Sequence, residues 1–81
     1  MEIEILLFGI AREFCQSESL TLPVAAGLNV GDLKKLLEQK YPRLKTIGSY
    51  MIAVNREYAR NDDMPVSEGS ELALIPPVSG G

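Results

Sequence analysis

The chain has 81 residues, which is enough for one domain with a small core but not for two. With 46% hydrophobic and 23% charged residues, it has the composition of a folded globular domain rather than that of a disordered chain. A net charge of −3 without a basic run argues against nucleic-acid binding, and one cysteine with no histidine excludes a disulfide framework and the usual zinc ligand sets.

The first quarter of the sequence predicts two paired strands. Residues 1–8 alternate between Glu and Ile and then become continuously apolar, which predicts a strand whose second half is buried on both faces. Residues 9–16 fit one or two helical turns, and residues 19–24 alternate as a second strand that forms a hairpin with the first. Pro23 has no amide donor, so we expect it at a sheet edge or at the strand's end.

Residues 29–41 predict the main helix. Asn29 is a favourable N-cap, Asp32 lies in the first turn where the helix dipole favours a negative charge, and Pro42 ends the segment. The apolar residues recur at helical spacing and form one stripe: Val30, Leu33, Leu36, Leu37 and Tyr41.

The second half of the sequence predicts three more strands separated by loops. Residues 43–49 are read as a loop anchored by Leu44 and Ile47. We expect a central strand at 50–54 and a tight turn at 55–57. A brief strand pairing at 58–59, a loop rich in polar residues at 61–69 and a last strand at 71–75 follow. Pro76 and Pro77 end the last strand.

This order of elements predicts an α+β fold, a β-grasp (ubiquitin-like) roll. We expect a mixed sheet of four to five strands with one main helix packed on one face. Because crossovers between parallel strands are right-handed, the last strand should lie parallel to the first and beside it. Residues 1–75 would form the domain, and residues 76–81 an extended flexible C-terminal tail ending in Gly-Gly.

The tail is the candidate for chemistry, because the sequence contains no Cys-His or Ser-His pair and no phosphate-binding glycine loop. Pro76 and Pro77 cannot donate to a neighbouring strand and would direct the chain outward. Val78 offers one apolar anchor, Ser79 a small polar contact, and Gly80 with Gly81 a stretch that could enter a narrow tunnel in another protein. Fully extended, the tail would carry the Gly81 carboxylate roughly 20 Å from the fold. The competing interpretation is an ordinary disordered terminus.

Several motifs together resemble a known family. AREF after the first strand, Val54-Asn55, and the ending EGSELALIPPVSGG are similar to the small, sulfur carrier subunit of molybdopterin synthase (MoaD-like sulfur carriers), and the likeness runs along the whole chain. A PPV segment followed by Ser-Gly-Gly is much more specific than Gly-Gly alone.

The resemblance implies a carrier that supplies a reagent rather than an active site. An adenylyltransferase similar to ubiquitin-activating enzymes would use ATP with Mg to adenylate the Gly81 carboxylate, and a sulfur donor protein would convert it to a thiocarboxylate. The large subunit of the synthase would then receive the tail and provide the catalytic residues for sulfur transfer to cyclic pyranopterin monophosphate, which forms the molybdopterin dithiolene. The family precedent is two small subunits with two large ones, with no cofactor or metal permanently bound to the small subunit.

Phe8 and Ile75 match apolar interface positions of that family. They would contact both partners if the outer face of the sheet is bare, and the competing role is core packing. Four polar residues could pair with acidic groups on a partner or remain solvated: Arg12, Asn55, Arg56 and Arg60. Cys15 could relay a persulfide, but its neighbours favour a small, half-buried residue.

Three functional classes remain open from the sequence. The first is the sulfur carrier of molybdopterin synthase. The second is a carrier for thiamine thiazole synthesis or tRNA thiolation, or a modifier joined to lysines as ubiquitin is. The third is a plain β-grasp interaction module whose Gly-Gly is incidental. No membrane span or targeting signal is recognised, and the single thiol favours a cytoplasmic location.

Overall fold

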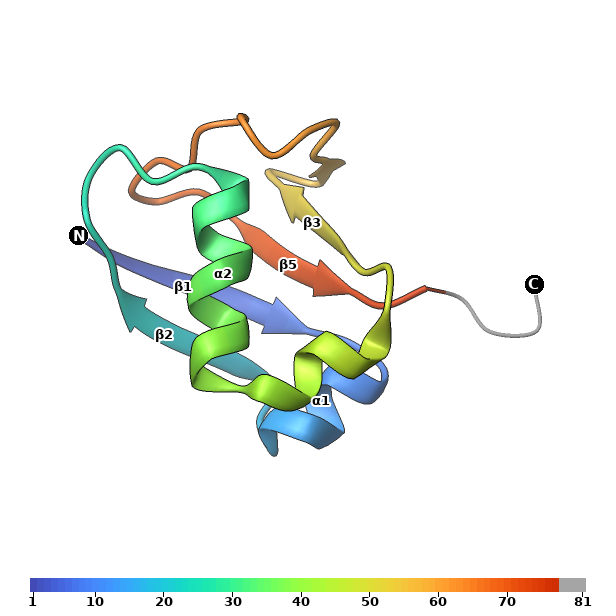
Figure 1. Ribbon diagram of the computed structural model, residues 1–81. Helices are drawn as coiled ribbons and strands as arrows, with labels where there is room; N and C mark the ends of the chain where they lie inside the picture. The colour runs from blue at the N-terminus through green and yellow to red at the C-terminus, as the bar shows by residue number, and fades with distance from the viewer. Residues whose placement is uncertain (78–81) are drawn as a thin grey trace.

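The structure, a computed structural model, describes residues 1–77 and forms one five-stranded sheet with helices packed on one side (Figure 1). In chain order its elements are β1 (Glu2–Leu7), α1 (Ile10–Cys15), β2 (Ser19–Pro23), α2 (Val30–Lys40), the 3-10 helix η1 (Pro42–Ile47), β3 (Met51–Val54), β4 (Glu57–Tyr58) and β5 (Leu72–Ile75). The strand order is β2-β1-β5-β3-β4. This architecture confirms the predicted β-grasp fold. Within the described part of the chain, no helix combines the length and apolarity needed to cross a bilayer.

The last strand lies in the middle of the sheet. β5 pairs in parallel with β1, with Leu6 opposite Ala73, and antiparallel with β3, with Met51 opposite Ile75. The predicted parallel pairing of the first and last strands is therefore confirmed. Since a central strand has no free edge, β5 is held by β1 as far as Leu74 and by β3 as far as Ile75.

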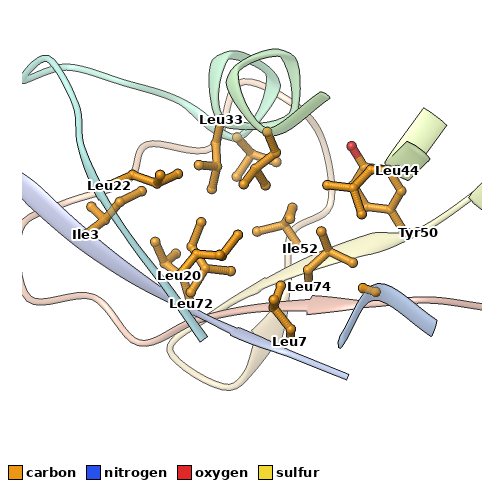
Figure 2. Close-up of a cluster of buried hydrophobic side chains, with 14 of the residues drawn as sticks. Ile3, Leu7, Leu20, Leu22, Leu33, Leu44, Tyr50, Ile52, Leu72 and Leu74 are labelled. Carbon is orange, nitrogen blue, oxygen red and sulfur yellow. The ribbon is translucent and has the colours of Figure 1, made fainter. Parts of the chain in front are cut away.

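One face of the sheet carries the core. Alternate residues of β1 and β5, among them Ile5, Leu7, Leu72 and Leu74, are at most 2% exposed and pack under Leu33 of α2. Figure 2 shows Leu7, Leu72 and Leu74 on the sheet side and Leu33 on the helix side of this cluster. The core is thus the single layer between the sheet and α2.

The prediction that the second half of β1 is buried on both faces is wrong. Leu6 is 47% exposed and Phe8 is 41% exposed. The alternation that starts with Glu2 and Glu4 continues to the end of the strand, because no element formed by residues 1–77 covers the outer face of the sheet.

The caps of α2 agree with the sequence prediction. The Asp32 amide donates to Oδ1 of Asn29 at 2.8 Å, and the Asn29 amide donates back to Oδ2 of Asp32 at 3.4 Å. This capping box satisfies two amides that the first helical turn leaves without backbone partners. The helix ends at Lys40, two residues before Pro42.

Two local predictions need correction. Most of residues 43–49, predicted as a loop, belongs to η1 (Pro42–Ile47), in which Pro42 supplies a fixed φ at the start and Leu44 is fully buried. β4 begins at Glu57, inside the predicted turn, because Asn55 and Arg56 alone make the turn with φ values of 53° and 71°. Such two-residue turns match the twist of a hairpin, although arginine is an unusual residue for that conformation.

Gly31 permits a close contact between α2 and the loop that precedes β5. Its amide donates to the Asp62 carbonyl at 2.9 Å, and a Cβ on Gly31 would lie 2.9 Å from the Asp62 Cβ. Lys34 on the next turn forms an ion pair with the Asp62 carboxylate at 3.2 Å. The loop is therefore held against the helix at a position where only glycine fits.

Gly31→Ala should destabilise the protein by about 1–3 kcal/mol, because overpacking outweighs the gain of up to ~1 kcal/mol that alanine gives in a helix. Urea unfolding measures the change, and Lys35→Ala on the exposed face of α2 is the control. Adding Asp62→Gly should restore most of the loss. Equal stability of Gly31→Ala and wild type would contradict the close contact.

Candidate functional site

The chain leaves the sheet at the end of β5. Ile75 is its last strand residue, Pro76 is half-buried and Pro77 is exposed. Pro76 lies beside Gly9, at the end of the parallel neighbour β1: a Cβ on Gly9 would be 3.2 Å from Cγ of Pro76, and Gly9 has a φ of +56°. The positive φ favours glycine at position 9, and a side chain there would also crowd Pro76.

The predicted tail residues Val78, Ser79, Gly80 and Gly81 lie outside the described residues. Pro76 and Pro77 fix where the chain departs from the sheet. This point lies at the end of a central strand, beside the end of β1 (Figure 1).

Large apolar side chains are exposed around this exit on the uncovered face of the sheet. We call Leu6, Phe8, Met51, Tyr58 and Ile75 the exit patch. The first four are 41–57% exposed, and Ile75 is half-buried and lies opposite Met51. A group of exposed apolar side chains on one face is typical of an interaction surface.

The two predicted interface residues belong to the exit patch. Phe8 and Ile75 both lie outside the core cluster. The alternative role for Phe8, core packing, is excluded by its 41% exposure.

A groove runs through the exit patch because the central strands carry alanine there. Leu6, Ala73, Ala53 and Tyr58 lie in one row across β1, β5, β3 and β4. The two alanines form a low floor between the leucine and the tyrosine, in a depression of about 420 Å³. We call this depression the alanine groove. Ala53 is only 7% exposed although it does not belong to the core cluster. The larger side chains beside it therefore shield it from solvent.

An exposed ion pair borders the alanine groove at the side away from the exit. Arg56 Nε lies 3.1 Å from Oε2 of Glu71. Asn55 fixes the backbone of Glu71 from the other side, since its amide donates to the Glu71 carbonyl at 2.7 Å and its Oδ1 accepts from the Glu71 amide at 3.0 Å. Of the polar residues proposed as partner contacts, Asn55 and Arg56 thus have contacts within the chain, as does Arg12, whose Nε donates to the Leu7 carbonyl at 3.4 Å.

Sequence reasoning missed Leu6, Met51 and Tyr58 as site residues. The sequence does carry a signal for Leu6, because in a strand its side chain points to the same face as those of Glu2 and Glu4. The apolar run that begins at Leu6 instead predicts burial on both faces of the sheet. Met51 and Tyr58 carry no local signal. Their exposure depends on the registers of β3 with β5 and of β4 with β3.

The titratable side chains that are buried have structural roles. Burial raises the pKa of the Cys15 thiol, which lies in the core cluster at 9% exposure. The Tyr50 hydroxyl donates to Glu38 at 2.5 Å, and burial followed by this hydrogen bond raises the Tyr50 pKa. Among residues 1–77 no three His, Cys, Asp or Glu side chains are grouped as metal ligands.

The site therefore consists of a chain exit surrounded by apolar side chains, and the fold is that of the β-grasp, ubiquitin-like class. Comparison with known proteins agrees. The ThiS family model matches residues 5–81, and the chain belongs to this family.

The chain resembles relatives and solved structures over its whole length. It is 39% identical to the molybdopterin synthase sulfur carrier subunit of Arabidopsis thaliana, covering 100% of this chain and 84% of that protein. The crystal structure of SAMP1, a small archaeal modifier protein of Haloferax volcanii, superposes with a TM-score of 0.85 at 29% identity and 100% coverage of both chains. Subunits 1 and 2 of the molybdopterin-converting factor of Helicobacter pylori have been solved as a complex, in which the matching chain is 26% identical, has a TM-score of 0.71 and is likewise covered in full. The resemblance predicted from the sequence is thus confirmed.

Native Cys15 should react slowly with iodoacetamide near pH 8, at least roughly tenfold more slowly than in urea, because the raised pKa leaves little thiolate and the sulfur is buried. Intact-mass measurement over time gives both rates. Equal rates would show that the thiol is accessible and would reopen a role for Cys15 in sulfur transfer.

Proposed function

We propose that this chain is the sulfur carrier of molybdopterin synthase. Its Gly81 carboxylate is adenylated by a ubiquitin-activating-like adenylyltransferase that uses ATP with Mg, and a sulfur donor protein converts it to a thiocarboxylate. The thiocarboxylate then gives its sulfur to cyclic pyranopterin monophosphate in the large subunit. Residues 76–81 act as the tail that enters each partner in turn.

The observation that carries this proposal is the position of the chain exit. A central strand, held on both sides, ends at Ile75 within the exit patch, so a partner that covers the patch also receives the residues that follow. The match of the whole of this chain to a molybdopterin synthase sulfur carrier subunit, and the solved complex of the two converting-factor subunits, support a large-subunit partner.

The chemistry requires little from the carrier's own side chains. A carboxylate is a poor electrophile until its oxygen becomes a good leaving group, and adenylation makes AMP that leaving group. A persulfide of the sulfur donor protein can then displace AMP at the carbonyl carbon, and a second thiol cleaves the acyl disulfide that forms, leaving the sulfur on Gly81 and a disulfide on the donor side. The resulting thiocarboxylate is a soft nucleophile, and Gly80 and Gly81 place no side chain in its way.

The C-terminus of protein isolated from producing cells should have one oxygen replaced by sulfur. Intact-mass measurement detects this change, and fragmentation assigns it to Gly81. Deleting Gly81 should abolish the modification and synthase activity while thermal stability stays nearly unchanged, since terminal residues contribute few core contacts. Wild-type protein that carries no sulfur, in cells that make the cofactor, would contradict the proposal.

Phe8→Ser should weaken binding to the large subunit by at least roughly tenfold, because the side chain is an exposed apolar anchor at the exit. Its effect on the free energy of unfolding should stay within about 0.5 kcal/mol, as for most surface positions. Titration calorimetry and urea unfolding measure the two effects, and Gln39→Ser on the exposed surface of α2 is the control. A parallel loss of stability and affinity would assign Phe8 to the core instead.

A modifier role is the second candidate, and the observation that favours it is the likeness to the small archaeal modifier protein at a TM-score of 0.85. It requires the same adenylated Gly81 but a lysine amine as the acceptor. Proteolysis of whole-cell protein followed by mass spectrometry distinguishes the two roles. Lysines joined to the C-terminus of this chain would support the modifier, and a free thiocarboxylate the sulfur carrier.

A further inference from the structure

The positive charge of the chain is concentrated on the helical side of the sheet. Residues 30–47, which contain α2 and η1, include five Lys or Arg and two Asp or Glu residues, a formal charge of +3 in a chain whose total is −3. The other residues together therefore carry −6. Because α2 and η1 cover the inner face of the sheet (Figure 1), this positive charge lies on the side away from the exit patch and the open face. We call the exposed side chains of residues 30–47 the helical face.

Most cations of the helical face are not neutralised within the fold. Lys34 is half-buried and pairs with Asp62 at 3.2 Å. The other four are exposed and form no ion pair with any residue of the described range 1–77: Lys35, Lys40, Arg43 and Lys45. Lys40 has a local function, because a cation in the last turn stabilises a helix. Lys35 lies in the middle of α2, where no such stabilisation is available.

Cations from two elements meet around a shallow hollow of about 220 Å³ that is lined by Lys35, Glu38, Gln39 and Lys45. We call it the basic hollow. The Glu38 carboxylate accepts a hydrogen bond from the Tyr50 hydroxyl at 2.5 Å, and in the described part of the chain it forms no ion pair with either lysine. A carboxylate from another molecule can therefore bind two lysines that the fold leaves free.

A mainly apolar hollow of about 310 Å³ adjoins the basic hollow. Its lining comes from the chain before α2 and from α2 itself: Pro23, Val24, Ala25, Leu28, Asp32, Lys35, Leu36 and Gln39. Lys35 and Gln39 line both hollows. Asp32, the carboxylate of this lining, already belongs to the capping box of α2. The two hollows together fit a segment that has an apolar side chain next to its carboxylates.

We propose that the helical face is a second docking surface of the carrier, for an acidic segment of the sulfur donor protein, and this inference rests on the proposed function. The adenylyltransferase and the large subunit both receive the tail, so both cover the chain exit. The donor acts while Gly81 is joined to AMP on the adenylyltransferase. A donor that recognises the carrier at this stage needs a surface that the adenylyltransferase leaves free, and the helical face lies on the opposite side of the sheet.

The observations favour an acidic protein segment over other anionic partners. A nucleic acid would have to approach a chain of net charge −3, and its phosphates cannot fill the apolar hollow. A peptide can place an apolar side chain beside Leu36 and its carboxylates on Lys35 and Lys45. Charge complementarity of this kind sets the orientation of a complex and speeds its association.

Sulfur loading at varied donor concentration tests this surface. The carrier, the adenylyltransferase and the persulfide-loaded donor of one organism are mixed with ATP and Mg. Pyrophosphate release reports adenylation, and intact mass reports the thiocarboxylate. Combining Lys35→Glu with Lys45→Glu should raise the half-saturating donor concentration at least roughly tenfold and leave pyrophosphate release at the wild-type rate. The difference should shrink as the salt concentration rises, because the pairs are exposed.

Two matched controls isolate the charge of the helical face. Combining Lys35→Arg with Lys45→Arg keeps the charge and removes both amines, and this carrier should load like wild type. Arg60→Glu makes the same kind of reversal at an exposed cation outside residues 30–47. It should change the half-saturating donor concentration by less than about twofold, whereas Lys45→Glu alone should raise it by about threefold or more.

Wild-type loading by the Lys35→Glu, Lys45→Glu carrier would overturn the docking surface. An equal loss of pyrophosphate release would also overturn it, because both lysines would then act at the adenylyltransferase. Two further measurements compare wild type with this variant: binding of labelled total tRNA by fluorescence anisotropy, and self-association by sedimentation velocity. Either property, present in wild type at physiological salt and lost in the variant, would assign the face to a nucleic acid or to a second copy instead. Wild-type carrier that releases pyrophosphate but gains no sulfur would contradict the proposed function itself, and this inference with it.

Discussion

The structure depends on the insertion of the last strand between the first and the third. β5 pairs with β1, which lies near the other end of the sequence, and with β3, so it completes the hydrogen-bond ladder of the sheet. It also completes the core, since Leu72 and Leu74 are at most 2% exposed. The strand that leads to the tail is therefore one that the fold cannot release. A force applied to the chain at Ile75 would be carried by the two strands that flank β5.

A chain of this size can cover only one face of its sheet. α2 and η1 cover the inner face, so every second residue of β1, β5 and β3 is left outside whatever its polarity. The sheet edges offer little to a partner. The Ser17 hydroxyl donates to the Ser19 carbonyl at 2.6 Å, Pro23 has no amide, and β4 is two residues long. Recognition by side chains on the open face is therefore favoured over strand addition.

The sequence predicted the features that depend on local signals. The Asn29 cap, the stop at Pro42 and the helical stripe between them are properties of neighbouring residues, and the order of elements with right-handed crossover placed β5 beside β1. What failed depended on distant contacts. The exposure of Leu6 follows because no element among residues 1–77 covers its face of the sheet. The need for glycine at position 31, about which the sequence made no prediction, follows from Asp62 in a distant loop.

The open face is instructive because its residues contradict the usual preferences of a sheet. Central strands favour β-branched and aromatic residues, yet Ala53 and Ala73 lie opposite each other at the centre, with large apolar side chains on both sides. Filling that gap would bury more apolar surface in the isolated chain. A fold selected only for its own stability gains nothing from an alanine floor, so the stability of the isolated chain does not account for the groove beside the chain exit.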